Sequence, residues 1–225
     1  MAGPAMTAVR PHDLVRLAAP EALLTGGAPG WVGDALARAP WVVVRRATAT
    51  AGRLAVGVRG AGRHQRHAAE APPAAVAGVV VPERLRSPPH HGPATGPVCR
   101  TRALAALHDL GPALDARKLV WGPVGSVGFE LATGQPATGP DSDLDLIVRV
   151  LELPDPGWAA DLLGGLTDAA ARVDCLLETP AGAVALAELA GGPAQVVLRT
   201  ADGPRLVTPA QVRAMCARRA GPVGG

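Results

Sequence analysis

Two aspartates separated by a single residue, Asp143 and Asp145, lie within a strongly apolar segment of the chain. On a β-strand alternate side chains point to the same face, so both carboxylates would project together while Leu144 and Leu146 pack on the other side. Adjacent carboxylates repel each other and are costly near a core unless a cation lies between them. Mg²⁺ prefers oxygen ligands and keeps waters or substrate phosphates in its shell. The pattern therefore predicts a magnesium site with Asp143 and Asp145 as ligands.

A third aspartate, Asp174, lies in a later apolar segment, where Val173 and Cys175 would face away from it. If that segment is a strand beside the one carrying Asp143 and Asp145, three carboxylates converge and could hold two metal ions. Two ions would stabilise the attacking and leaving oxygens of an in-line phosphoryl displacement. The alternative is that Asp174 is an exposed strand residue without a metal role.

Gly125 and Ser126 open a predicted short helix upstream of the aspartates, and Gly134 ends it. The first N–H groups of a helix and its dipole both favour an anion. Gly125 also allows a ligand to approach the backbone closely. The pair therefore predicts a phosphate-binding site, although Ser126 could instead be a simple helix cap. Glu130, on the same helix, could approach this site or lie at the surface.

At these residues the chain resembles the nucleotidyltransferase superfamily, in which a Gly-Ser precedes an Asp-x-Asp on the next strand. The spacing here is longer because residues 134–141 form an inserted loop. The chain further resembles the malonate decarboxylase holo-acyl-carrier-protein synthase family, also called phosphoribosyl-dephospho-CoA transferase. The segments that carry this resemblance are RPHDL at 10–14, PWVVVRR at 40–46, VGVRG at 56–60, QR at 65–66, residues 122–148 and the tail at 181–188.

The resemblance implies an enzyme that moves a phosphoribosyl-dephospho-CoA group from triphosphoribosyl-dephospho-CoA to a serine of the malonate decarboxylase acyl carrier protein, with release of diphosphate. Asp143 and Asp145 take the catalytic, metal-binding role, and Gly125 and Ser126 bind substrate phosphates. Asp174 as a metal ligand extends the logic of the superfamily. Two alternatives stay open: another metal-dependent nucleotidyltransferase acting on RNA or a small molecule, and a non-catalytic nucleotide-binding protein.

The elements that must position these residues alternate between strand and helix in the second half of the chain. We expect a mixed α/β (α+β) domain over residues 117–225, with a nucleotidyltransferase-like mixed sheet and flanking helices. A smaller β-rich domain over residues 1–116 precedes it, and residues 87–97 form a loop rich in proline and glycine. The expected strands are 41–44, 54–58, 76–81, 118–121, 144–150, 173–177, 195–199 and 204–207, and the expected helices are 101–114, 125–133, 157–172, one from Pro180 and one from Pro209.

Composition bounds the function further. Hydrophobic residues make up 48% of the 225 residues, so disorder is not the default expectation. Aromatic residues make up 2% and the formal net charge is +3, so we expect no nucleic-acid partner, since RNA binding calls for a basic groove and stacking aromatics. The three cysteines form no CxxC pair, which argues against a zinc knuckle or a disulfide framework. No signal peptide or membrane span is evident, so we expect a cytoplasmic protein.

A basic cluster contains Arg59, Arg63 and Arg66 with His64 and His67. It is either a solvated loop or an anion site for CoA phosphates or an acidic carrier protein, because arginine can bind oxygen pairs in a bidentate manner. Its two histidines, like the adjacent pair at 90–91, have no Cys or carboxylate at ligand spacing. We therefore expect neither pair to bind a transition metal.

Overall fold

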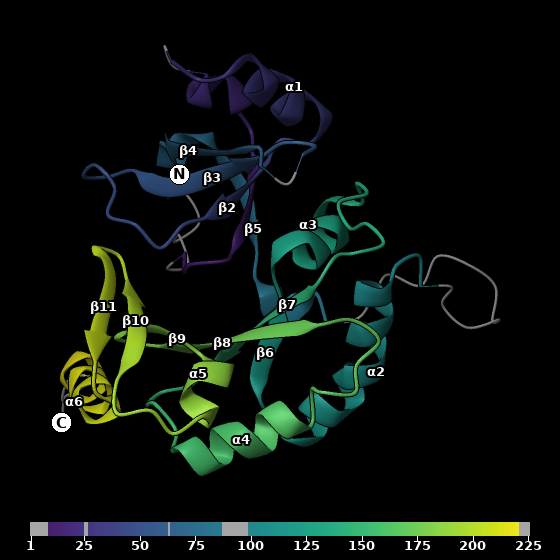
Figure 1. Ribbon diagram of the computed structural model, residues 1–225. Coiled ribbons are helices and arrows are strands. Elements are labelled where there is room, and N and C mark those ends of the chain that lie inside the picture. Colours follow the sequence, from purple (N-terminus) through teal and green to yellow (C-terminus); the bar gives the residue numbers. More distant parts are fainter. Residues whose placement is uncertain (1–8, 25–26, 63, 87–98, 221–225) are drawn as a thin grey trace. The chain divides into compact units, whose positions relative to one another are not determined.

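The computed structural model describes residues 9–24, 27–62, 64–86 and 99–220. The chain divides after Val81 into two compact units (Figure 1), which are described separately. None of the helices in the described ranges combines the length and the apolar character that crossing a membrane would require. The expected combination of a β-rich first part and a mixed α and β second part is confirmed.

The first unit contains a five-stranded antiparallel sheet in the order β4-β3-β2-β1-β5. Its core is aliphatic: Val15, Val42 and Val56 are fully buried and pack with Leu36. The elements are β1 (Leu14–Leu17), α1 (Gly30–Arg38), β2 (Trp41–Val44), β3 (Leu54–Arg59), β4 (Arg66–Ala71) and β5 (Val76–Val80), with short 3₁₀ turns at Pro20–Leu23 and Pro73–Ala75.

The second unit contains a six-stranded mixed sheet in the order β11-β10-β9-β8-β7-β6, in which β7 and β8 form the one parallel pair. Its strands are β6 (Val120–Pro123), β7 (Leu144–Arg149), β8 (Val173–Thr179), β9 (Gly182–Ala185), β10 (Val196–Thr200) and β11 (Gly203–Val207). Its helices are α2 (Arg102–Ala116), α3 (Gly125–Thr133), α4 (Pro156–Gly164), α5 (Leu186–Ala190) and α6 (Pro209–Ala220), after a 3₁₀ turn at Pro82–Arg84.

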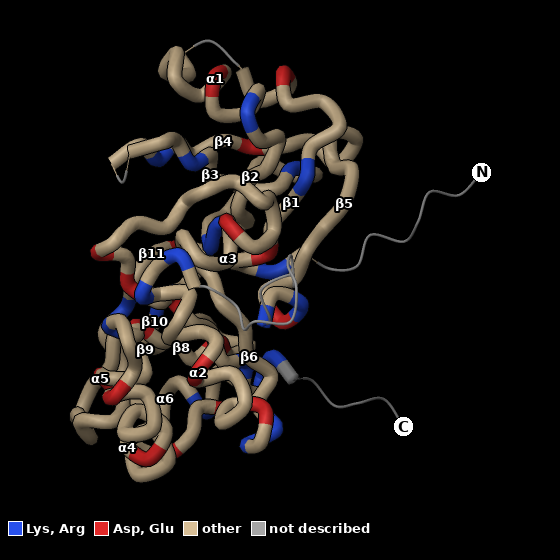
Figure 2. Tube along the Cα trace, turned by 90° about the vertical axis from the view of Figure 1, so that its right-hand side faces the viewer, with Lys and Arg blue, Asp and Glu red and all other residues tan. Residues whose placement is uncertain are grey.

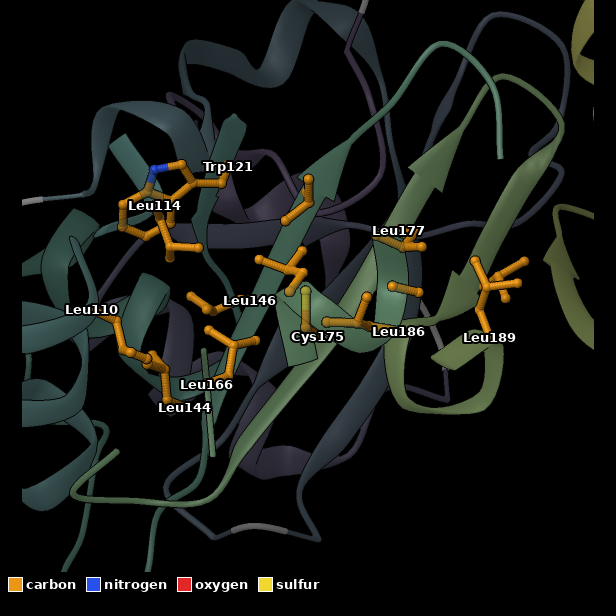
Figure 3. Packing of buried hydrophobic residues seen from close by; sticks show 14 of the residues in the cluster. Leu110, Leu114, Trp121, Leu144, Leu146, Leu166, Cys175, Leu177, Leu186 and Leu189 are labelled. Atoms are coloured by element: carbon orange, nitrogen blue, oxygen red, sulfur yellow. The ribbon is translucent and has the colours of Figure 1, made fainter. Parts of the chain in front are cut away.

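Helix α2 packs in the apolar core of the second unit, which decides to which unit this helix belongs. Leu146 of β7 and Cys175 of β8 lie in one apolar cluster with Leu110 and Leu114 of α2 (Figure 3). Helix α2 therefore belongs to the second unit, and the expected boundary after residue 116 moves to Val81. Helix α2 continues through the exposed Pro112, with the buried Leu110 and Leu114 on either side of it.

The turn after β8 differs from its prediction. Thr179-Pro180 was expected to open a helix, but β8 continues to Thr179 and returns as β9. The Thr179 hydroxyl donates to the carbonyl of Gly182 at 2.8 Å and accepts from the Ala181 amide at 3.1 Å, so it closes a hairpin instead of capping a helix. Gly182 fits there because a Cβ atom would lie 2.5 Å from the carbonyl oxygen of Arg199 on β10.

Helix α4 is shorter than expected and ends at Gly164, whereas the sequence suggested a helix to residue 172. The side chain of Asp155 caps its first turn by accepting from the Trp158 amide at 2.8 Å. The chain then returns through turns to Val173, and this crossover makes β8 parallel to β7. The expected loop at 87–97 lies outside the described residues.

Candidate active site

The two aspartates of the Asp-x-Asp segment lie at the start of β7. Asp143 immediately precedes the strand, and Asp145 is its second residue. Leu144 and Leu146 are 0% and 1% exposed and anchor the segment in the core (Figure 3). The partly exposed aspartates alternate with them along the chain. Parallel pairing aligns Asp145 with Asp174 on β8. Aligned residues on neighbouring strands point to the same face, so the sheet places these two carboxylates side by side.

The start of α3 lies directly against Asp145. A Cβ atom added to Gly125 would lie 1.9 Å from Oδ2 of Asp145, so only glycine leaves room for this carboxylate. Gly125 also has a φ of +60°, a left-handed conformation that other residues adopt at a cost. The Val124 amide, one residue earlier, donates to the carbonyl of Asp145 at 2.9 Å and ties the helix entry to β7. The helix start and the Asp145 carboxylate are thus held together by backbone geometry.

Ser126 is the second residue of α3 and is half-buried. The residue before the helix is Val124, whose side chain makes no capping hydrogen bond. The residue before α3 therefore provides no side-chain cap, unlike the residue before α2, where the Thr101 hydroxyl accepts from Leu104. Such a helix start suits an anion, and it lies beside carboxylates that would bind a cation. Phosphate binding by Gly125 and Ser126 stays a prediction.

Arg172, which the sequence did not single out, joins the aspartates from the residue before β8. Its Nη2 atom donates to Oδ1 of Asp174 at 2.9 Å. The hydrogen bond and charge of Asp174, followed by the charge of Asp143 and more weakly that of Asp145, raise the pKa of the guanidinium. All three carboxylates therefore lie within electrostatic reach of one arginine. The only sequence signal was its position two residues before Asp174.

The side chains available to a metal ion are two carboxylates with a third nearby. In the parts of the chain that the structure describes, no three His, Cys, Asp or Glu side chains already form a ligand set. Asp174 is bonded to Arg172, whereas Asp145 lies against the helix start and Asp143 immediately precedes β7. Mg²⁺ is commonly held by one or two carboxylates, with waters and substrate phosphates completing its shell. Asp143 and Asp145 fit that donor set, and the metal roles of all three aspartates stay predictions.

Glu130 holds the loop that leads into Asp143. Its carboxylate accepts hydrogen bonds of 2.8 Å from the amides of Ala137 and Thr138 and from the Thr138 hydroxyl. It also forms an ion pair with Arg100 at 2.7 Å. Burial favours a higher pKa for Glu130, but Arg100 and the loop donors outweigh it and lower the pKa. Glu130 thus has a structural role in the inserted loop, one that residue type alone did not reveal.

Replacing Glu130 with glutamine should lower the free energy of unfolding by about 1–3 kcal/mol at pH 7, because several partly buried donors and Arg100 lose an ionised acceptor. The lowered pKa means that this stability is present above the ordinary value of 4.5 and is lost as the pH falls through the folded-state pKa. Urea unfolding at pH 7 and below pH 4 should show the difference between wild type and variant shrinking in acid. Glu152→Gln, at an exposed position, is the control, and a difference that persists unchanged in acid would contradict the assignment.

The basic cluster lies in the first unit and is partly strand, not loop. Arg59 ends β3 and pairs in register with Arg66, the first residue of β4. His67 makes an edge-on ring contact with Trp31, with centroids 6.4 Å apart. Arg63 and the histidines at 90–91 lie outside the described residues. An anion-binding role for this cluster stays a prediction.

Cys175, next to Asp174, faces the core and is 7% exposed. Burial raises the pKa of its thiol to about 12, so at pH 8 only roughly one molecule in ten thousand carries the reactive thiolate. Iodoacetamide at pH 8 should therefore leave Cys175 unmodified in the folded chain and alkylate it in urea, as peptide mass spectrometry would show. Rapid alkylation of the folded chain would overturn this placement.

Family models of known proteins match each of the two units. A family model described as "Phosphoribosyl-dephospho-CoA transferase MdcG C-terminal domain" matches residues 92–210, and the corresponding N-terminal domain model matches residues 10–82. No solved structure matches the chain significantly.

Proteins named phosphoribosyl-dephospho-CoA transferase are similar to this chain over nearly their whole length. The relative from Azotobacter vinelandii is 46% identical over 202 residues, covering 88% of this chain and 92% of its own. The relative from Pseudomonas putida is 44% identical over 203 residues, covering 90% and 95%. With two domain models and full-length relatives in agreement, the chain belongs to the phosphoribosyl-dephospho-CoA transferase family and is a transferase enzyme.

Proposed function

We propose that this enzyme transfers a phosphoribosyl-dephospho-CoA group from triphosphoribosyl-dephospho-CoA to a serine of the malonate decarboxylase acyl carrier protein and releases diphosphate. The names of the relatives and of the family models support the transferred group. The observation that carries the chemistry is the contact between the Asp145 carboxylate and the start of α3 at Gly125. A group that attracts cations and a group that attracts phosphate meet at this contact.

The reaction forms one bond and breaks another at the same phosphorus. The oxygen of the carrier serine attacks the phosphorus nearest the ribose, the bond to the diphosphate oxygen breaks, and the serine proton passes to a carboxylate of the Asp143–Asp145 pair. Ser126 and the first N–H groups of α3 hold the diphosphate portion in line with the attack. Asp143 and Asp145 would also hold Mg²⁺, which supplies positive charge against the phosphate oxygens.

An RNA substrate has less support. Lys and Arg are spread along the trace of the second unit, with acidic residues among them (Figure 2). Of the two tryptophans in that unit, Trp121 is fully buried and bonded to Asp115, and Trp158 is partly buried and packs against the apolar core. Neither is an open platform for stacking bases. We therefore propose a protein acceptor and a CoA-derived donor in preference to a nucleic acid.

The test incubates the full chain with apo carrier protein, triphosphoribosyl-dephospho-CoA and Mg²⁺. We expect the carrier to gain the mass of the phosphoribosyl-dephospho-CoA group and diphosphate to appear in equal amount. A carrier whose acceptor serine is replaced by alanine is the control for the acceptor, and ATP in place of the donor is the control for general nucleotidyl transfer. No mass gain from an intact donor, or equal transfer from ATP, would overturn the proposal.

A further inference from the structure

Arg172 has no role in the mechanism above, yet it lies among the groups that the mechanism uses. We infer that Arg172 binds the phosphate chain of the substrate, and in particular the diphosphate that leaves. The inference rests on the proposed function because it assigns a residue to the polyphosphate part of the same site. Its evidence is the geometry of the arginine and the charge of the groups around it.

The backbone of Arg172 is fixed at the aspartate pair. Its carbonyl accepts from the amide of Leu144, the residue between Asp143 and Asp145, at 2.9 Å. The next residue, Val173, is aligned with Leu144 in the parallel β7–β8 pair. Arg172 therefore keeps its place beside the aspartates through the sheet, whatever its side chain contacts.

The side chain of Arg172 is available to a ligand. It is 73% exposed, and the bond to Asp174 uses the Nη2 nitrogen. A guanidinium carries five N–H donors in a planar fork, so one fork can contact a carboxylate and an anionic ligand together. Phosphate oxygens suit this fork because they accept two parallel hydrogen bonds. Neither Arg172 nor Asp174 is buried, so a change of partner requires little desolvation.

The negative charge of the three aspartates also favours a cationic side chain at the position of Arg172. Arg172 is bonded to Asp174, Asp174 is aligned with Asp145 in the parallel pair, and the Arg172 carbonyl accepts from Leu144, which lies between Asp143 and Asp145. A polyphosphate brings further negative charge to the same place, and like charges in close contact oppose binding. The guanidinium of Arg172 reduces that repulsion when it lies between the carboxylates and the phosphates. An arginine so placed also stabilises the charge that develops on departing diphosphate.

The test measures binding of inorganic pyrophosphate to the full chain by calorimetry in the presence of Mg²⁺, without donor or carrier. We expect Arg172→Ala to weaken pyrophosphate binding at least about tenfold, in the range reported for charge-assisted contacts. Arg172→Lys should restore part of the affinity, because lysine keeps the charge but lacks the fork. Arg117→Ala is the matched control, since Arg117 is also an exposed arginine in an ion pair, with Asp161 at 2.6 Å.

The outcomes separate this inference from the proposed function. Pyrophosphate affinity that is unchanged in Arg172→Ala, or reduced equally in Arg117→Ala, would overturn the role of Arg172 even if the carrier is modified normally. A selective loss in Arg172→Ala supports the role even if the carrier test fails, because the pyrophosphate probe requires neither carrier nor donor. Binding of Mg²⁺ alone should not weaken in Arg172→Ala, and a parallel loss would show that Arg172 acts only by arranging the aspartates.

Discussion

Replacing Asp145 with asparagine should slow transfer to the carrier protein by about a thousandfold or more. The substitution keeps the size of the side chain against Gly125 but removes its charge, and an amide neither accepts the serine proton nor holds Mg²⁺ as a carboxylate does. Losing several kcal/mol of charge stabilisation in the transition state corresponds to a factor of this order. Single-turnover kinetics, read by mass spectrometry of the carrier, would measure the effect.

Asp161→Asn is the matched control for this prediction. Asp161 is an exposed aspartate on α4 that is paired with Arg117, in the same unit as Asp145. We expect its variant to transfer at the wild-type rate. The thermal midpoint of Asp145→Asn should not fall, because removal of one of two adjacent carboxylates relieves repulsion. A transfer rate within tenfold of wild type for Asp145→Asn would place the chemistry elsewhere in the chain.

Replacing Gly125 with alanine should reduce the transfer rate by about a hundredfold or more while the chain still folds. The new methyl group would meet Oδ2 of Asp145 at 1.9 Å, so the carboxylate or the helix start must move. Displacement of a reacting group by about 1 Å can lower a rate by this factor. The left-handed backbone at Gly125 adds a cost of about 1–2 kcal/mol to stability.

Gly134→Ala is the control that separates the two effects of Gly125→Ala, the strain in the backbone and the crowding of Asp145. Gly134 ends the same helix with a φ of +71°, and a Cβ atom there would meet nothing within 4 Å. We expect both variants to lose stability in urea unfolding, Gly125→Ala at least as much as Gly134→Ala because of the added crowding, and only Gly125→Ala to lose activity. Equal losses of activity would mean that strain in α3, and not the crowding of Asp145, limits the reaction.

The sequence predicted the parts of the site that depend on local pattern. Alternation of Leu144 and Leu146 with aspartates marks a strand with one buried face, and Gly134 marks the end of a helix. Both signals lie within a few consecutive residues, so they can be recognised in the sequence without knowledge of the fold. The apolar segment around Asp174 likewise predicted a strand, but that this strand lies beside Asp145 was only a condition of the three-carboxylate site, and the structure supplies the pairing.

Features that depend on contacts between distant segments could not be predicted. Arg172 gained its position only when β8 paired with β7, and Glu130 gained its partners when Arg100 and the loop folded onto it. Thr179 shows the same limit: a threonine before proline suits a helix start and a hairpin turn equally well, and the close approach of β9 to β10 selected the turn.

The parallel pairing of β7 and β8 has a consequence for the order in which this protein forms during synthesis. Parallel neighbours cannot be joined by a tight turn, so the chain from Val150 to Arg172 must emerge from the ribosome before β8 can dock. The Gly125–Asp145 contact joins α3 to β7, whereas Asp174 and Arg172 arrive only with the later strand. A chain that ends near residue 150 would thus contain Gly125, Asp143 and Asp145 but lack Asp174 and the guanidinium of Arg172.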